Sequence, residues 1–575
     1  MADTRDADSG DADPGSGRST RPEASDSPAD PTRRRLLEGL AIGGAALALG
    51  GCTTLAGGAA PAVHVASGRN LDALLRRHIQ TVVVIYAENR SFNNLFGNFP
   101  GLAQPLAALP PERALQRDRD GRVLATLPPV WHGLVPHEQV VQHRRYRIGE
   151  DAITGLANRP WALRTPAGEP LPTGLVTRDL WHRFYANQMQ INGGRNDGFV
   201  AFGNSGALVM GHYGDGAVNL RLWSLAREYT LCDNFFMGAF GGSFLNHQYL
   251  IAAQPPFYPD FRSSPARGRI AVVEGDDPAG TRLKLAGDSP ASAMQGPPNF
   301  ASHATLSPDG WAVNTMGPAY APAFSRDPAR PQYAKTSDPL TLPPQAHMTI
   351  GDMLSAGGVD WAWYAGGWAL ALDGRGDHSL SALFPESPNF QPHHQPFNYF
   401  ARYAPGSAGR AHLRDGGVGE TAASNRFIAD IEAGRLPPVA FYKAQGNLNM
   451  HAGYSDVDAG DRHIARVIDA LRSSPQWPQM LVVVTVDENG GWWDHVAPPK
   501  ADRWGPGTRI PALLISPHAH TGHVDHSVYD TGSIARFLTR RFGLTRLPGL
   551  AVREQAMRAA SGVAPGDLTA ALRFA

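Results

Sequence analysis

The chain has 575 residues, enough for one large core or several domains, and its 52 Lys and Arg are balanced by 52 Asp and Glu. It has no net charge and, in the part expected to fold, no run of basic residues interleaved with aromatic ones, which argues against nucleic acid as a partner. The two cysteines, Cys52 and Cys232, are too few for a disulfide framework or a cysteine-based zinc site.

The N-terminal region is predicted to consist of three segments that precede the folded domain. Residues 1–31 are rich in Asp, Ser, Pro, Gly and Ala without apolar periodicity, so we expect them to be disordered. Residues 32–52 resemble a twin-arginine export signal, because an arginine pair precedes two leucines and an apolar stretch too short to span a membrane. Residues 53–74 are interpreted as a linker.

The export signal ends in a second pattern. Leu49-Gly50-Gly51-Cys52 resembles the cleavage box of bacterial lipoproteins, in which Cys52 would carry a lipid anchor. Cleavage nearby by an ordinary signal peptidase is the alternative. We therefore expect a protein exported by the twin-arginine route that is periplasmic, anchored to the membrane as a lipoprotein, or secreted.

Two continuous apolar runs dominate the part that is expected to fold. TVVVIYA before Glu88 and MLVVVTV before Asp487 predict strands buried on both faces of a parallel sheet. Further strands are predicted at 361–364, 439–442 and 510–516, and a helix at 461–472 whose N-terminus Asp458 or Asp461 could cap. The alternation predicts a three-layer α/β/α fold with a central, mostly parallel sheet.

The spacing of these elements favours one discontinuous domain over several. Residues 75–545 are predicted to form it, because the polar residues after the two long strands make sense only if the fold brings them together. The stretches at about 100–175 and 255–345 are dense in Pro and Gly, so we expect loop-rich insertions that shape the pocket. Residues 546–575 are expected to form a C-terminal tail.

Oxygen-bearing side chains follow the two long strands. Carboxylates and an amide at the carboxyl ends of neighbouring strands can converge on a divalent cation, although oxygen donors alone do not choose the metal. The alternative is that these acids cap neighbouring helices. The candidate ligands are Glu88, Asn89, Asp487 and Glu488.

A Gly-Gly-Ser sequence supplies a candidate nucleophile. Ser243 follows Gly241 and Gly242 after an apolar run and precedes a predicted helix. Glycine lets the backbone approach an anion, and a helix N-terminus favours phosphate. Ser243 could then be activated by coordination to the metal, but a Gly-Gly-Ser sequence by itself is more often a turn or a helix cap.

Three motifs together carry a family resemblance. ENRSF from Glu88, GSFLNH from Gly242 and DENGGWWDHV from Asp487 resemble the bacterial phosphoesterase family of acid phosphatases and phospholipases C, in the family's order. The resemblance implies an alkaline-phosphatase-like fold, Ser243 as nucleophile, and a substrate-binding role for Gly242. It also implies that the metal is bound by Glu88, Asn89, Ser243, Asp487 and Glu488.

The resemblance further implies catalytic histidines at His182 and His451. A third lies in HHQPF, where His394 is favoured as catalytic and its neighbour His393 as substrate-binding. The chain departs from the family at Asn93, where aspartate is common. The pair Asp494-His495 could support the metal site through hydrogen bonds or form a structural turn.

The function implied is hydrolysis of phosphate monoesters, as in the acid-phosphatase branch, through a phosphoserine on Ser243. A phospholipase C acting on phospholipid diesters is the alternative, and an exported binding lipoprotein without activity is a third. Phosphate esters, possibly phospholipids, are thus the expected partners, and a divalent metal ion the expected cofactor.

Overall fold

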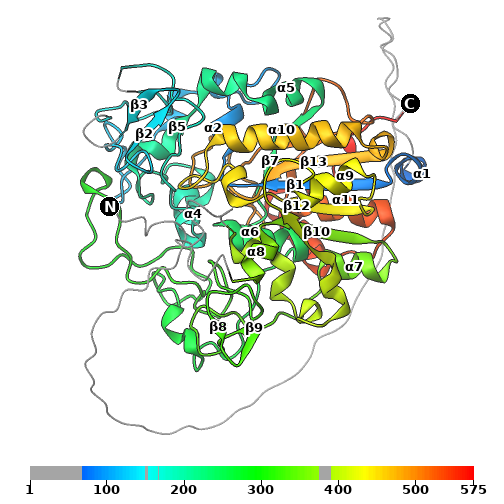
Figure 1. The fold of residues 1–575 in the computed structure, drawn as a ribbon. Coiled ribbons are helices and arrows are strands. Elements are labelled where there is room, and N and C mark those ends of the chain that lie inside the picture. Colours follow the sequence, from blue (N-terminus) through cyan, green and yellow to red (C-terminus); the bar gives the residue numbers. More distant parts are fainter. Residues whose placement is uncertain (1–67, 149–152, 166, 375–389, 575) are drawn as a thin grey trace, which may run out of the picture. The chain divides into compact units, whose positions relative to one another are not determined.

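A computed structural model describes residues 68–148, 153–165, 167–374 and 390–574 (Figure 1). Asp72 and the described residues after it belong to one compact unit. The predicted disordered segment, export signal and lipid-anchor cysteine lie outside the described residues. Within the described ranges, no helix has both the length and the apolar character needed to cross a membrane.

The core is an eight-stranded sheet. Among its strands, only β14 (Ala512–Ile515) is antiparallel to its neighbours, so the predicted mostly parallel sheet is confirmed. The spatial order is β11 (Leu413–Gly417), β10 (Trp361–Gly366), β12 (Val439–Lys443), β1 (Thr81–Ala87), β13 (Met480–Val486), β14 (Ala512–Ile515), β6 (Thr230–Cys232) and β15 (His523–Asp525).

The two long apolar runs form neighbouring strands at the centre of the sheet. Every residue of β1 and of β13 is buried, as expected for strands covered on both faces. They pair in parallel with Ala87 opposite Val486. Because the register is level, the residues that follow the two strands leave the sheet side by side.

Helices cover both faces of the sheet, which confirms the predicted three layers (Figure 1). One group consists of α5 (Arg221–Glu228), α9 (Arg426–Glu432) and α10 (Val457–Ser473), and the other of α6 (Ser243–Ala252), α7 (Ile350–Ala356) and α11 (Gly532–Phe542). The remaining α-helices are α1 (Gly68–His78), α2 (Phe92–Phe96), α3 (Pro111–Ala114), α4 (Phe184–Ile191), α8 (Trp368–Leu372) and α12 (Pro548–Ser561).

Helix α10 begins earlier than predicted, because a different aspartate caps it. The side chain of Asp456 accepts a hydrogen bond from the backbone N–H of Ala459 at 2.7 Å. Asp461 instead accepts from the backbone N–H groups of Arg221 and Leu222 at the start of α5. The prediction that Asp458 or Asp461 caps the helix was wrong, and Asp461 ties two helices together.

The Pro- and Gly-rich stretches and the C-terminal segment surround this core. Short two-stranded sheets join β2 (Glu138–Val141) to β3 (Arg144–Arg147), β4 (Trp161–Ala162) to β5 (Gly211–His212), β8 (Arg326–Asp327) to β9 (Arg330–Ala334), and β7 (Phe235–Phe236) to β16 (Tyr529–Asp530). Within 546–575, Arg553 of α12 is buried and pairs with Asp502 at 2.8 Å and Asp530 at 3.2 Å.

Candidate active site

The strand ends bring four predicted ligands together. The side chains of Glu88 and Asn89 after β1, and of Asp487 and Glu488 after β13, are buried. The backbone N–H of Asn89 donates to Asp487 Oδ1 at 3.2 Å. The backbone N–H of Asp487 donates to the Ala87 carbonyl at 3.1 Å. The parallel pairing therefore continues past the strands and fixes the four side chains in one place.

Ser243 is the first residue of α6 and lies against this group. Its Oγ donates a hydrogen bond to Asn89 Oδ1 at 3.3 Å. The preceding Gly242 lies against the His182 ring, where an added Cβ would lie 3.1 Å from a ring carbon. The predicted nucleophile and the predicted metal ligands thus lie in one buried cluster.

Two predicted histidines point their Nε2 atoms at the carboxylates. His182 Nε2 lies 3.7 Å from Glu488 Oε1, and its Nδ1 lies 2.6 Å from the Leu180 carbonyl. His451 Nε2 lies 3.9 Å from Glu88 Oε2. The Tyr454 ring stacks on His451 at 4.2 Å between centroids, and its hydroxyl donates to Glu88 Oε2 at 2.8 Å. In each histidine, a backbone carbonyl beside Nδ1 leaves Nε2 turned toward the carboxylates.

The third histidine position is occupied by two adjacent rings with different surroundings. His394 Nε2 lies 2.5 Å from Glu88 Oε1. The His393 ring lies 5.4 Å from the His247 ring and 5.1 Å from the His394 ring. Both rings are buried at the site, but His394 makes the direct contact with a carboxylate.

The sequence prediction missed two charged or titratable side chains at the centre of the cluster. Lys443, buried at the end of β12, has its Nζ 2.5 Å from Glu88 Oε1 and 3.8 Å from Asp487 Oδ2. His247 lies one turn after Ser243, with Nδ1 2.8 Å from the Ser243 carbonyl. Lys443 directly follows a predicted strand, as Glu88 and Asp487 do, so the same reasoning could have found it.

Burial moves the carboxylate pKa values in different directions. Burial alone would raise the pKa of Glu88, but Lys443 and His394 beside it hold the pKa well below its usual range. Burial raises the pKa of Asp487 to about 6 and that of Glu488 well above its usual range. Burial lowers the pKa of His394 to about 4, so this ring is neutral near pH 7.

The donor set fits a divalent cation. Asp487 Oδ2 and Glu488 Oε1 are buried and accept no hydrogen bond from the residues that the structure describes. Glu88, His247 and Asp487 present ligand atoms that all lie within 4.8 Å of one another. Buried carboxylate oxygens without donors are costly unless a cation compensates them.

The departure at Asn93 is accommodated in a separate network. Asp494 accepts from the Asn93 backbone N–H at 2.9 Å and pairs with Arg509 at 3.0 Å. His495 Nδ1 lies 2.9 Å from Asn93 Oδ1. These contacts join α2 to the loop after β13, which favours the structural interpretation of the Asp494-His495 pair.

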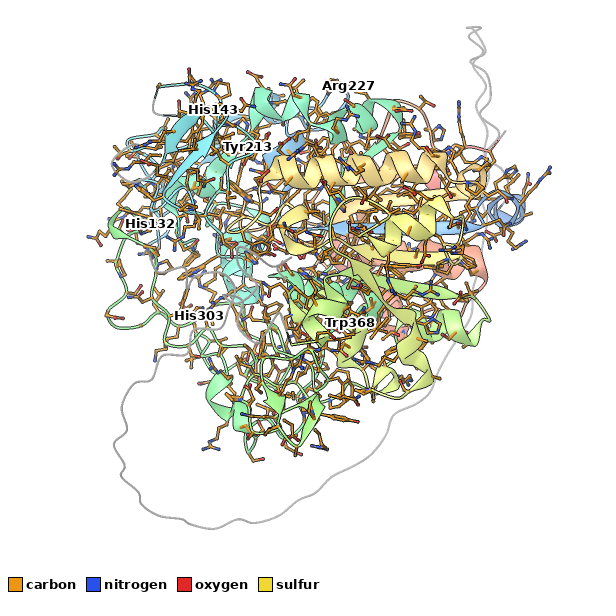
Figure 2. The ribbon with its side chains drawn as sticks, viewed as in Figure 1. His132, His143, Tyr213, Arg227, His303 and Trp368 are labelled. Carbon is orange, nitrogen blue, oxygen red and sulfur yellow. The ribbon has the colours of Figure 1, made fainter. Side chains whose placement is uncertain are left out.

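A small hollow next to Ser243 connects the site to residues from the second insertion. His182, Arg183, Gly242 and Asn314 are among its lining residues. An Arg183 Nη atom lies 2.5 Å from Nδ1 of His303, whose pKa burial and the guanidinium lower to about 3. Among the described residues, Arg183 has no carboxylate ion pair. Figure 2 labels His303 in the part of the molecule that holds this insertion.

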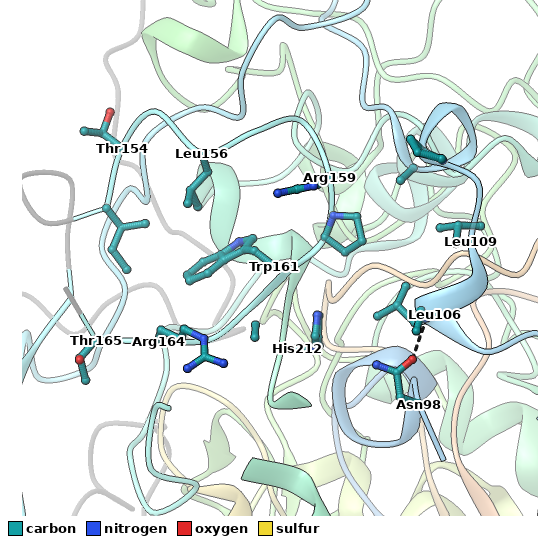
Figure 3. A pocket seen from close by; sticks show the side chains of 16 residues that line it. Asn98, Leu106, Leu109, Thr154, Leu156, Arg159, Trp161, Arg164, Thr165 and His212 are labelled. Carbon is teal, nitrogen blue, oxygen red and sulfur yellow. Dashed lines mark hydrogen bonds between the residues drawn. The ribbon is translucent and has the colours of Figure 1, made fainter. Parts of the chain in front are cut away.

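A larger hollow than the one beside Gly242 lies elsewhere. A hollow of about 720 Å³ in the first insertion is lined by Arg159, Trp161, Arg164 and His212 together with apolar residues such as Leu106 and Leu156 (Figure 3). None of the predicted site residues lines it.

The sequence was compared with known proteins. The model of the phosphoesterase family matches residues 79–545. A non-hemolytic phospholipase C of Pseudomonas aeruginosa is 31% identical over 178 residues, which cover 25% of each chain. A hemolytic phospholipase C of the same organism is 23% identical over 500 residues, 81% of this chain and 53% of that protein. The chain thus spans about half or less of the length of these relatives.

Solved structures were compared as well. A protein of the alkaline phosphatase superfamily from Vibrio parahaemolyticus matches at a TM-score of 0.27 and 12% identity, over 58% of this chain and 62% of that one. Structural similarity at this level supports no conclusion about activity.

We predict that Gly241→Ala lowers the free energy of unfolding by at least about 3 kcal/mol, because φ is +92° and the new Cβ would lie 2.6 Å from the Phe184 backbone. Gly543 also has a positive φ but nothing within 4 Å, so Gly543→Ala should cost only about 1 kcal/mol. Urea unfolding measures both. Equal losses in the two variants would show that the close approach at Gly241 is not tight.

Proposed function

The chain belongs to the phosphoesterase family, and we propose that it hydrolyses phosphate monoesters through a phosphoserine on Ser243, as an acid phosphatase does. The observation that carries this proposal is the position of Ser243, at the N-terminus of α6 and within hydrogen-bonding distance of Asn89 in a cluster of buried carboxylates. A serine so placed can reach a phosphate held by the helix N-terminus.

The metal proposal rests on the donor set. Five residues would hold one divalent cation, and when bound it supplies positive charge to the phosphate oxygens and to the serine oxygen. Carboxylate and amide oxygens suit Mg²⁺, Ca²⁺ or Mn²⁺. These residues are Glu88, Asn89, Ser243, Asp487 and Glu488.

In the proposed reaction Ser243 Oγ attacks phosphorus, and the bond from phosphorus to the leaving oxygen breaks. The Ser243 proton passes to a neutral histidine of the site such as His394, and His182 or His451 in its protonated form gives a proton to the leaving oxygen. Backbone N–H groups after Gly242 face the phosphoryl oxygens as negative charge develops there. Water then cleaves the phosphoserine and restores the serine hydroxyl.

Arg183 supports the choice of monoesters. Its positive charge next to the hollow at Gly242 is opposed by no carboxylate among the described residues, and the His303 ring beside it is neutral near pH 7. A monoester dianion is attracted more strongly than a diester monoanion, and a quaternary ammonium group is repelled. The second candidate, a phospholipase C, is favoured by the names of the relatives.

Export by the twin-arginine route and a lipid anchor at Cys52 belong to the same proposal. They are supported by the pattern of residues 32–52 alone. Together they would place a phosphatase outside the cytoplasm, in the periplasm, on its membrane or in the medium.

We predict that Ser243→Ala lowers phosphate release from p-nitrophenyl phosphate by about three orders of magnitude or more, because the nucleophile is lost. The exposed Ser473→Ala, also on a helix, should keep normal turnover. Mass spectrometry of an acid-quenched reaction should find phosphate on Ser243. Normal turnover by Ser243→Ala would exclude it as the nucleophile, and an inactive wild-type protein would support the binding lipoprotein.

We predict that Glu88→Gln and Asp487→Asn each reduce bound divalent metal per chain, and that the double variant is no slower than either single one. Residues that serve one ion act as a unit, so their effects on rate are not additive. Elemental analysis after gel filtration measures the metal. If the two acids only capped helices, each change would cost about 0.5–2 kcal/mol of stability and leave the metal content unchanged.

We predict that Arg183→Gln lowers the preference for p-nitrophenyl phosphate over p-nitrophenyl phosphorylcholine by about fivefold or more, because it removes a charge that favours the dianion. The two substrates share a leaving group, so the ratio of their kcat/KM values measures only the effect of the choline substituent on phosphorus. Arg267→Gln, an exposed change in the second insertion, is the control. A wild-type protein that prefers the choline ester would support the phospholipase C alternative.

A further inference from the structure

A buried lysine lies among the proposed metal ligands. Lys443 ends β12, which pairs in parallel with β1 on the side opposite β13. Its Nζ lies 2.5 Å from Glu88 Oε1, 3.8 Å from Asp487 Oδ2 and 5.4 Å from the centre of the Tyr86 ring. Lysine is almost never fully buried without a partner, so its presence here requires a reason.

The charges around the site supply that reason. Glu88, Asp487 and Glu488 carry three negative charges when all are ionised, as cation binding requires, and Lys443 carries one positive charge. The net charge of these four side chains is therefore −2, which one divalent cation would neutralise.

The other buried cations nearby have different partners. Arg90 donates to the Met450 carbonyl at 2.8 and 3.1 Å, and Asp179 and Asp456 oppose its charge. Arg509 pairs with Asp494 at 3.0 Å. Among the described Lys and Arg residues, Lys443 is therefore the one whose charge lies in contact with the proposed ligands.

We propose that Lys443 is a positioning residue that fixes the ionic charge of this site: it holds Glu88 and Asp487 together and makes the remaining pocket selective for a divalent cation over a trivalent one. The inference rests on the metal site of the proposed function. It adds that a fixed internal charge, and not the oxygen ligands alone, determines which ion is accepted.

The test compares two ions of similar size and different charge, Ca²⁺ and Tb³⁺, which both prefer oxygen ligands. In Lys443→Met, the ratio of the Ca²⁺ to the Tb³⁺ dissociation constant should rise at least tenfold, because repulsion by one unit charge is lost. Lys284→Met, at an exposed lysine, and Lys443→Arg should both keep the wild-type ratio. Calorimetry or terbium luminescence gives both constants without any measurement of activity.

The outcomes separate the two proposals. A lysine that serves only the fold would weaken both ions equally, so an unchanged ratio in a folded Lys443→Met overturns the inference and leaves the metal site standing. A wild-type protein that binds neither ion overturns the metal site and the inference together. If Lys443→Met does not fold, Lys443→Gln, which can still donate to Glu88, must show the same change in ratio.

Discussion

The parallel pairing of β1 with β13 is the constraint on which the site depends. Their level register places Glu88 beside Asp487 in a buried position, where like charges repel and water cannot screen them. The surrounding contacts offset this cost. Lys443 and Tyr454 contact Glu88, and the backbone N–H groups of Asn89 and Glu488 donate to Asp487.

The loops that carry the remaining site residues are anchored to the same strand ends. Arg90, which follows Glu88 and Asn89 after β1, donates to the Met450 carbonyl and so holds the loop that contains His451. Gly490, with a φ of +59°, passes so close to Asn89 that an added Cβ would lie 2.4 Å from its carbonyl oxygen. Backbone contacts of this kind hold the buried side chains at the strand ends in fixed positions.

Residues of the second insertion form part of the surroundings of Ser243. The backbone N–H of Phe184, the first residue of α4, donates to Asn314 Oδ1 at 3.0 Å, and His303 lies against Arg183. Residues from 255–345 therefore reach the hollow beside Ser243. The ends of the strands hold the buried carboxylates, and the inserted loops line the hollow beside them.

The sequence by itself determined the layered fold and most of the site. Continuous apolar runs rich in β-branched residues predict strands covered on both faces, and polar residues that follow neighbouring parallel strands lie at one edge of the sheet. It could not assign the cap of α10. Asp456 caps α10 and Asp461 accepts from the start of α5, and only the packing of the two helices distinguishes these roles. The strand-end pattern could have included Lys443, but its contact with Glu88 after β1, and that of His247 in α6 with Asp487 after β13, depend on the tertiary structure. Only the tertiary structure decided the balance of charges in the site. The electrostatic energy of a buried charge depends on its distance to other charges, and these come from residues distant in sequence.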